Sequence, residues 1–332
     1  MTFTRGEKIY IFVTFLVGMS IFSLLILPSQ NNKLHMKQTQ WQIQSIDTMK
    51  YSRDMAKYNA SNVKYTTEVK KQVADIANTG ANYIAIDTPY DDEFLPVLNL
   101  WVYTAREHGL HIWFRGNWSG WEGWFGYNRI DEQTHLAKTK QFIKENKDLF
   151  QDGDIFSSCP ECENGDAKLN LANQQSVAAY RQFLIEEYQA TKDAFVDIHK
   201  NVASNYFSMN TDVAREIMDR ETTIQLDGLV VIDHYVLTPE QLANDVSLIA
   251  LQSGGNIMLG EMGAPIPSIH GAMTDEQQRQ WLEQSLHELS QIGKLNGINY
   301  WVNKGGSTAL WRPDGSPKPA VAVIKSYFTK NQ

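Results

Sequence analysis

Short apolar runs alternate with amphipathic stretches eight times between Trp41 and the C-terminus, and this alternation constrains the fold more than any other feature. The apolar runs predict eight strands, over residues 43–46, 83–86, 111–114, 155–158, 202–206, 229–232, 257–259 and 298–302. The stretches between them have apolar residues near helical spacing and predict helices over residues 64–79, 94–108, 131–149, 174–198, 211–220, 239–252, 275–292 and 319–329. Strict alternation implies a parallel sheet, and eight units imply that the sheet closes into a (β/α)8 TIM barrel.

The alternative architecture is a doubly wound open sheet, which would carry a glycine-rich phosphate-binding loop after its first strand. The corresponding residues, Ser45–Lys50, include no glycine, so nucleotide binding is not supported. The net charge of −8 argues against a nucleic acid as partner, because binding to phosphates requires a basic face.

The N-terminus carries a membrane-targeting pattern. Arg5 and Lys8 precede an apolar segment, Ile9–Leu27, that is about as long as the ~20 residues a helix needs to cross the hydrocarbon core. We expect residues 1–8 in the cytoplasm, a transmembrane signal-anchor over 9–27, a polar tether over 28–40 and an extracytoplasmic barrel over 41–332. A cleaved signal peptide is the alternative, but its apolar region is usually shorter and ends at a small-residue cleavage site, which is not evident here.

Cys159 and Cys162 are the only cysteines in the chain. Two cysteines cannot complete a four-ligand zinc site, and no His-Glu-x-x-His motif accompanies them, so we expect neither a metal nor a cofactor. The pair is either two thiols or one tight local disulfide beside a loop.

Acids, amides and aromatic residues follow the predicted strands, at the end of the barrel where such folds place their sites. After the fourth to eighth strands, the set comprises Glu161, Glu163 and Asn164 near the fourth strand, Asn205 and Tyr206 at the fifth, Asp233, His234 and Tyr235 at the sixth, Glu261 at the seventh, and Trp301 and Asn303 at the eighth. Asp87 follows the second strand, and Arg115, Asn117 and Trp118 follow the third. Amides and charges bind hydroxyl groups and aromatic faces stack on pyranose rings, so the set predicts a carbohydrate site.

The loop Asn117–Tyr127 is rich in tryptophan and glycine. Trp118, Trp121 and Trp124 recur every third residue, while the interspersed glycines argue against a helix. Three exposed tryptophans on such a loop would form sugar-binding subsites, and the alternative is a hydrophobic plug at the barrel top. The residues after the first strand either contribute binding groups or form a charged capping network; they are Asp47, Lys50, Arg53 and Asp54.

Two carboxylates stand out, because two carboxyl groups facing each other across a cleft can cleave a glycosidic bond. Glu261 lies in the segment IMLGEMGAP, directly after the seventh apolar run, and Glu161 lies in IFSSCPECENG, after the fourth. Either residue alone could instead form a salt bridge or cap a helix. Their joint occurrence after the fourth and seventh strands favours a catalytic pair.

This layout resembles clan A of the glycoside hydrolases, the retaining (β/α)8 enzymes with catalytic glutamates after strands four and seven. Gly260–Gly263 (GEMG) resembles the nucleophile motif of the clan, and Pro160–Gly165 (PECENG) resembles its acid/base motif. His234 and Tyr235 resemble the aromatic pair near the nucleophile, and Trp301 resembles the tryptophan of strand eight. The resemblance covers residues 41–330 and implies that Glu261 is the nucleophile and Glu161 the acid/base.

One position departs from the clan pattern. The clan normally has an asparagine before the acid/base, where it binds the sugar 2-hydroxyl, and this chain has Pro160. Either Asn117, Asn164 or Asn205 takes over this contact, or Glu163 is the true acid, since both glutamates share strand parity. The motif match favours Glu161.

The two roles require different environments. The acid/base must be protonated at rest, and the poorly solvating Cys159, Pro160 and Cys162 would help Glu161 to stay neutral. The nucleophile must be ionised, and we expect Arg115 and Tyr235 to hold Glu261 in that state. The alternatives are a structural ion pair for Arg115 and a core position for Tyr235. His234 has no expected catalytic role.

We therefore expect a membrane-anchored retaining glycoside hydrolase that cleaves a β-linked polysaccharide or oligosaccharide outside the cell. A catalytically inactive barrel that binds glycan at the membrane is the second hypothesis, and the replacement of asparagine by Pro160 leaves it open. A metal-dependent barrel hydrolase is disfavoured, because histidines do not cluster after the appropriate strands.

Overall fold

The computed structural model describes residues 41–59, 62–165 and 169–329. The predicted anchor (9–27) and tether (28–40) lie outside these residues. Among the helices of the described part, none combines the length and the apolar character needed to span a membrane.

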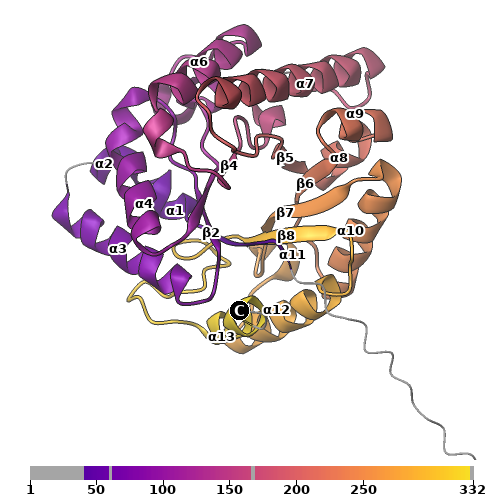
Figure 1. The fold of residues 1–332 in the computed structure, drawn as a ribbon. Helices are drawn as coiled ribbons and strands as arrows, with labels where there is room; N and C mark the ends of the chain where they lie inside the picture. Colours follow the sequence, from indigo (N-terminus) through magenta and orange to yellow (C-terminus); the bar gives the residue numbers. More distant parts are fainter. Residues whose placement is uncertain (1–40, 60–61, 166–168, 330–332) are drawn as a thin grey trace, which may run out of the picture. The chain divides into compact units, whose positions relative to one another are not determined.

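Eight parallel strands form one sheet, as the alternation predicts (Figure 1). The sheet order is β4-β3-β2-β1-β8-β7-β6-β5, so β1 pairs with both β2 and β8. The strands are β1 (Ile43–Asp47), β2 (Tyr83–Ile86), β3 (His111–Phe114), β4 (Ile155–Phe156), β5 (Ser208–Asn210), β6 (Leu229–Asp233), β7 (Asn256–Met262) and β8 (Leu295–Tyr300).

The segment between β4 and β5 closes the barrel. Ala203 forms a parallel bridge with Ile155, its carbonyl accepts from Phe156 N at 2.8 Å, and Ser208 O accepts from Glu161 N at 2.8 Å. The strands therefore make a closed (β/α)8 barrel. The prediction of the fifth strand over 202–206 is wrong, because only Ala203 of that run joins the sheet and the ladder with β6 begins at Ser208.

Helices surround the strands (Figure 1). The longer ones are α3 (Val63–Ala77), α4 (Leu95–Glu107), α6 (Glu132–Glu145), α7 (Gln174–Asp197), α10 (Pro239–Ser253), α12 (Asp275–Leu289) and α13 (Pro319–Phe328). Side chains cap the first turns of five of them, from Asn62, Asp131, Asn173, Thr238 and Thr274.

Short helices fill the connections between strands. They are α1 (Met49–Ser52), α2 (Ala56–Asn59), α5 (Ser119–Glu122), α8 (Thr211–Ile217), α9 (Arg220–Gln225) and α11 (Pro267–His270), with 3-10 turns at Asp92–Phe94, Trp124–Gly126, Lys147–Leu149 and Cys162–Asn164. The helix predicted over 211–220 is thus two helices. The tryptophan loop, expected to lack helix, contains α5, which ends at Gly123 in the left-handed conformation (φ 72°).

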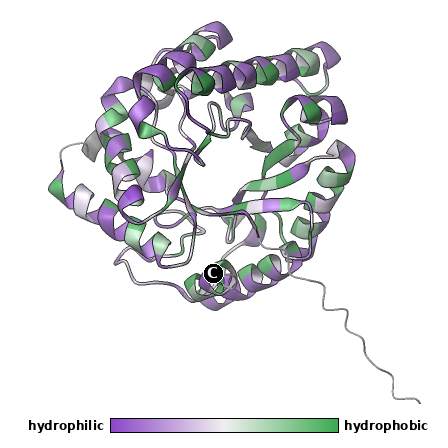
Figure 2. Ribbon diagram, viewed as in Figure 1, coloured by the Kyte–Doolittle hydropathy of each residue, from purple (hydrophilic) through white to green (hydrophobic). Residues whose placement is uncertain are grey.

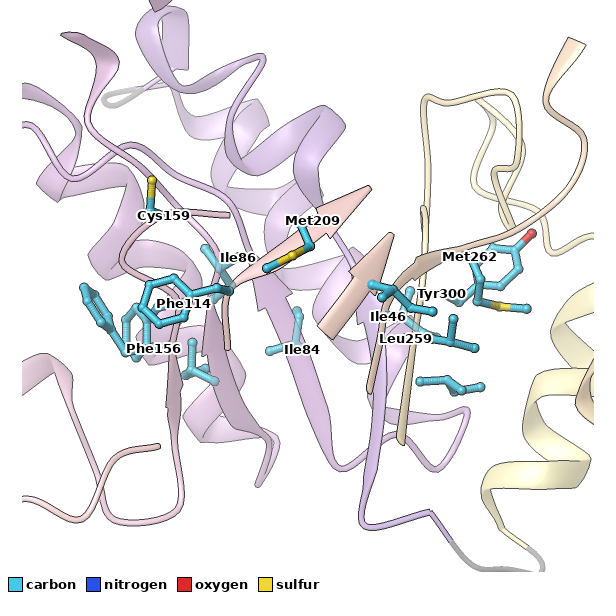
Figure 3. Packing of buried hydrophobic residues seen from close by; sticks show 14 of the residues in the cluster. Ile46, Ile84, Ile86, Phe114, Phe156, Cys159, Met209, Leu259, Met262 and Tyr300 are labelled. Atoms are coloured by element: carbon cyan, nitrogen blue, oxygen red, sulfur yellow. The ribbon is translucent and has the colours of Figure 1, made fainter. Parts of the chain in front are cut away.

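Alternation along the strands creates two hydrophobic cores. Ile84, Ile86 and Phe114 point toward the helices, where Phe114 lies 6.3 Å from Phe156 between ring centroids (Figure 3). Residues of the opposite parity, such as Ala85 and Trp113, fill the barrel interior. Both faces of the strands are therefore apolar, and Figure 2 shows β6 and β7 as largely hydrophobic while the helices mix both kinds of residue.

Candidate active site

Alternate side chains of each strand face the barrel interior and form the interior core. At the carboxyl ends of four strands, the last of these inward-facing side chains is charged. Asp47 ends β1, Asp87 and Arg115 directly follow β2 and β3, and Asp233 ends β6. Each shares its parity with interior residues of its own strand, such as Ile43, Trp113 and Val231. The same alternation that packs the barrel therefore directs these charges to its axis.

Arg115 is the centre of this charged layer and is almost fully buried. Its guanidinium donates to Asp47 at 2.9 Å, to Glu261 at 3.1 Å and to Asp233 at 3.3 Å, and it also donates to the Ser208 hydroxyl at 3.1 Å. Three carboxylates thus share one buried cation, which satisfies the requirement that buried charges be paired.

Carboxyl groups outnumber cations in this layer. Burial raises the pKa of Asp233 well above its ordinary range, and the nearby Glu261 raises it further. Burial likewise raises the pKa of Asp87, with Asp47 as the next cause. One oxygen of each side chain, Oδ1 of Asp233 and Oδ2 of Asp87, has no hydrogen-bond partner among the described residues. The carboxyl groups of Asp87 and Asp233 therefore hold their protons to higher pH than exposed carboxyl groups do.

Glu261 lies within β7, near its end, rather than after the strand as the apolar run predicts. The ladder places Asp233 opposite Glu261 across a register shift in β6–β7. Gly260 permits this arrangement, because a Cβ atom there would lie 2.4 Å from Oδ1 of Asp233.

The contacts expected for Glu261 are present. Arg115 donates to Oε1 at 3.1 Å and the Tyr235 hydroxyl donates to Oε2 at 2.7 Å. Burial raises the pKa of Glu261, while Arg115 and the Tyr235 hydrogen bond lower it. Each oxygen of Glu261 therefore has a donor that stabilises its ionised form.

Glu161 has a different environment. Its backbone is in the left-handed region (φ 46°, ψ 47°), which is uncommon for a residue other than glycine, and its N–H is bonded to Ser208 O of β5. The only side-chain donor on its carboxyl group among the described residues is the Asn210 amide, at 3.4 Å. Burial raises the pKa of Glu161, and the charge of Glu261 raises it further.

Glu163 is held by a network outside the cleft. Its Oε1 accepts from the Asn210 backbone N–H at 2.9 Å, and its Oε2 accepts from the Tyr180 hydroxyl at 3.2 Å. Burial raises its pKa as well. The two carboxyl oxygens of Glu163 thus have partners on β5 and α7, and these bonds connect the loop after β4 to both elements.

A cleft of about 170 Å³ has Arg115, Glu161 and Glu261 among its lining residues. It is lined by Met49, Arg53, Asp87, Arg115, Glu122, Trp124, Pro160, Glu161, Asn164 and Glu261. Residues from the loops after β1, β2, β3, β4 and from β7 therefore converge on one place, as the barrel topology requires.

The tryptophan loop divides between core and cleft. Trp118 and Trp121 are 4% and 0% exposed, so the prediction that they are exposed is wrong. Trp118 donates to the Thr139 hydroxyl at 3.0 Å, and Trp121 stacks on Phe183 at 5.5 Å between centroids. Trp124 lines the cleft, with the Arg53 guanidinium 4.8 Å from its ring centroid. The first two form the plug, and the third is available to a ligand.

This division predicts opposite effects for two substitutions. Trp121→Ala should lower the free energy of unfolding by about 3–5 kcal/mol, because it removes a fully buried ring. Trp124→Ala should change stability by less than about 1 kcal/mol and weaken the binding of a ligand in the cleft instead. Urea unfolding and calorimetric titration of each variant measure the two quantities. A stable Trp121→Ala protein with impaired binding would contradict the division.

Several predicted site residues lie away from the cleft. Asn205 donates to Leu226 O at 2.9 Å, and Tyr206 packs edge-on against Trp113 inside the barrel. Both were placed at the mouth by the misplaced fifth strand. His234 is bonded to Thr211 and Asp245, at 2.6 Å and 2.9 Å, and Asn303 donates to Gln72 at 2.7 Å.

The remaining predicted residues are brought together in part. Asn164 lines the cleft, and Trp301 packs edge-on against Tyr235, with 6.0 Å between ring centroids. Asn117 is fully buried and donates to Glu122 at 3.1 Å. After the first strand, Arg53 lines the cleft, Asp47 pairs with Arg115, and Lys50 and Arg53 both bond to Asp54.

Asn210 and Glu122 lie at the site and were not singled out from the sequence. Asn210 ends the true β5 and contacts both Glu161 and Glu163, so correct placement of that strand would have found it. Glu122 lies between Trp121 and Trp124 in the tryptophan loop, and no motif marks it in the sequence.

Cys159 and Cys162 form a disulfide, which resolves the two alternatives left by the sequence. Both are buried beside Glu161, and Cys162 O accepts from the Trp121 indole at 3.2 Å. No group of three or more His, Cys, Asp or Glu side chains in the described part of the chain is arranged to hold a metal ion.

No protein-family model matches the chain, and no curated protein matches it. Solved structures do match. A GH5_18 variant from Bifidobacterium longum subsp. longum in complex with Manβ1-4GlcNAc has a TM-score of 0.61 at 11% identity, covering 87% of this chain and 78% of its own. A GH5_18 from Bifidobacterium longum subsp. infantis has a TM-score of 0.61 at 12% identity, covering 88% and 79%.

A second group of similar structures is longer than this chain. The β-D-glucuronidase of Dictyoglomus thermophilum has a TM-score of 0.54 at 15% identity over 80% of this chain, and the match spans 47% of that enzyme. The two groups agree with the resemblance read from the sequence motifs. The chain has the (β/α)8 barrel fold that these GH5_18 and β-glucuronidase structures share.

Proposed function

We propose that this protein is a retaining glycoside hydrolase that cleaves a β-linked polysaccharide or oligosaccharide. The observation that carries the proposal is the contrast between two carboxyl groups in one cleft. Glu261 has a cation and a hydroxyl on its oxygens, whereas Glu161 has a single long amide contact. Such a difference divides the labour between a nucleophile and an acid.

In the proposed mechanism Glu161 protonates the leaving oxygen while Glu261 attacks the anomeric carbon and forms a covalent glycosyl-enzyme. Arg115 and Tyr235 orient Glu261 for this attack and stabilise its charge before it. Glu161, now ionised, then removes a proton from water as the water attacks the anomeric carbon. This second displacement releases the sugar, returns the proton to Glu161 and restores the starting anomeric configuration.

Asn164 is the candidate for the contact with the sugar 2-hydroxyl. Of Asn117, Asn164 and Asn205, only Asn164 is among the residues that line the cleft in the described structure. The side-chain amide of Asn117 donates to Glu122, and that of Asn205 donates to Leu226 O. Asn210, beside Glu161, is a second possible donor. Pro160, which replaces the asparagine of the clan, is the specific observation that favours the alternative of an inactive glycan-binding barrel.

A panel of β-linked polysaccharides and oligosaccharides tests the proposal. Incubation with purified protein, followed by chromatography of the products, should show cleavage of at least one substrate. Binding to glycan without bond cleavage on any member would favour the inactive barrel.

We also propose that residues 9–27 anchor the protein in a membrane with the barrel outside the cytoplasm, a proposal supported by the charge and apolar pattern of the sequence.

The pH dependence should follow from the raised pKa values of the two glutamates. Glu261 must be ionised, so activity is lost as pH falls through its pKa. Glu161 must be protonated, so activity is lost as pH rises through its pKa. Because burial raises both, the bell-shaped profile of kcat/KM should be displaced upward from the ordinary Glu pKa of about 4.3. In Glu161→Ala, the alkaline limb of the kcat/KM profile should disappear when the substrate has an activated leaving group. If the alkaline limb persists in this variant, it reports the titration of a group other than Glu161.

A further inference from the structure

Glu122 is a third carboxyl group in the cleft, and the mechanism above does not use it. It comes from the tryptophan loop after β3 and lines the same cleft as Glu161 and Glu261. Its Oε1 accepts from the Asn117 amide at 3.1 Å, while its Oε2 has no partner among the described residues. Burial raises the pKa of Glu122 to about 7, and the charge of Glu161 contributes.

A buried chain of polar side chains positions Glu122. Nε2 of His135, on α6, lies 3.0 Å from Oδ1 of Asn117. On the other side of the ring, Oε1 of Glu187, on α7, lies 2.9 Å from Nδ1 of His135 as an ion-pair contact that lacks hydrogen-bond geometry. Oδ1 of Asn117 also accepts from the Trp118 backbone N–H at 2.7 Å. Oδ1 is therefore an acceptor, Nε2 of His135 donates to it, and the Asn117 amide is free to donate to Glu122.

Burial of these polar side chains carries a desolvation cost, which would have no explanation if Glu122 had no functional role. Glu187, His135 and Asn117 are all 0% exposed. Three polar groups from α7, α6 and the loop after β3 are thus withdrawn from water to fix the amide that holds one oxygen of Glu122. The other oxygen is left for a ligand.

Asp87 provides an independent indication that the ligand is cationic. It is 2% exposed, lines the cleft, and has an Oδ2 atom with no hydrogen-bond partner in the described structure. The cleft as a whole has four carboxyl groups against Arg53 and Arg115. Arg115 is already shared with Asp47 and Asp233, and Arg53 is paired with Asp54 at 2.9 Å. A ligand cation would let Asp87 and Glu122 lose their protons and pair with it, whereas a uronate would raise the pKa values of both carboxyl groups further.

We propose that Glu122 and Asp87 select a sugar that carries a free amino group, that is, a β-linked 2-amino-2-deoxy glycan that is wholly or partly without N-acetyl groups. The inference rests on the proposed function and names its substrate class. Glu122 accepts a hydrogen bond from the ligand ammonium, and Asn117 is a positioning residue that acts through Glu122.

The test uses aryl β-glycosides in the gluco, galacto and manno series that differ only at C2, which carries an ammonium, an acetamide or a hydroxyl group. In the series that the wild-type protein cleaves, kcat/KM should be about tenfold or more higher for the ammonium compound than for the other two. Glu122→Gln should remove this preference, because kcat/KM should fall more for the ammonium compound than for the hydroxyl compound. Glu145→Gln, which removes an exposed carboxylate on α6, is the matched control and should keep the preference.

A second variant separates positioning from folding. Asn117→Ala leaves Glu122 in place but removes the donor that holds it, so it should lower the ammonium-to-hydroxyl ratio in the same direction. A general loss of structure would lower kcat/KM on all three compounds and leave the ratio unchanged. Calorimetric titration of Glu161→Gln with the ammonium and acetamide compounds should give the same order of affinity without turnover.

The outcomes distinguish the two proposals. Cleavage with an equal or greater rate on the acetamide or hydroxyl compound, or a preference that survives Glu122→Gln, overturns the amino-sugar inference and leaves the hydrolase proposal standing. An aryl β-glycoside of the same series with a C6 carboxylate serves as a fourth compound. If the protein prefers it over the other three, the amino-sugar inference is overturned in favour of Arg53 as the selecting group. Absence of cleavage in every series, together with absence from the polysaccharide panel, removes the hydrolase proposal itself.

Discussion

Glu261→Gln should lower kcat by at least ~10⁴-fold, because the amide cannot form the glycosyl-enzyme through which both steps pass. The amide has nearly the shape of the carboxylate, and it retains an oxygen that can accept from Arg115 or Tyr235. A thermal unfolding midpoint close to that of the wild type would show that the loss is chemical. Steady-state kinetics on the best substrate of the panel provides the measurement.

The same residue should be labelled by a mechanism-based probe. A 2-deoxy-2-fluoro glycoside of the cleaved sugar slows both displacements, so the covalent intermediate accumulates, and peptide mapping should locate the sugar on Glu261. Proton NMR of the first-formed product should show the anomer of the substrate. An inverted first product, or a label on any other residue, would overturn the mechanism without affecting the fold.

Glu161→Ala should lose about 10²–10⁴-fold in kcat/KM on substrates with poor leaving groups, since it removes the proton donor. The loss should be small for the first step with an activated aryl leaving group, which needs no protonation. Added azide should then accelerate turnover and yield a β-glycosyl azide, because a small anion can attack the glycosyl-enzyme without a general base. The azide dependence of the rate, with chromatography of the product, measures the rescue.

Glu163→Ala is the natural comparison for this experiment, because Glu163 follows Glu161 by two residues and is also partly buried. Its oxygens are occupied by the Asn210 backbone and the Tyr180 hydroxyl. Its loss should therefore affect the stability of the loop after β4 more than the chemical step. Azide rescue of Glu163→Ala, and not of Glu161→Ala, would transfer the acid/base role to Glu163.

The left-handed backbone at Glu161 bears on the design of that experiment. A non-glycine residue at φ 46° is strained, and the bond from its N–H to Ser208 O helps to hold it. Both Ala and Gln have the same restriction, so they preserve the comparison with the wild type. The adjacent disulfide between Cys159 and Cys162 and the β5 contact together fix the position of this carboxyl group.

The sequence by itself determined the architecture and the two principal carboxylates. Eight alternations of apolar run and amphipathic helix admit few folds, since parallel strands joined by helices must bury both faces. Placement of a residue at a strand end is a local property of the chain, and it is sufficient to bring Glu161, Glu261, Arg115 and Tyr235 to one end of the barrel. Membrane anchoring was predicted from the same kind of local pattern and stays a prediction.

Only the tertiary structure decided which residues near those ends face the cleft. The run 202–206 has apolar residues at Val202, Ala203 and Tyr206, yet the hydrogen-bonding edge of β6 is paired by Ser208–Asn210. This shift removes Tyr206 from the mouth and brings Asn210 to it. Trp118, Trp121 and Trp124 are alike in sequence, and their separation into plug and cleft depends on α6 and α7, which cover the first two. The carboxyl groups around Arg115, and the chain from Glu187 to Glu122, join residues distant in sequence. Their charges and protons depend on burial and on partners from other elements, which hydrophobic periodicity does not encode.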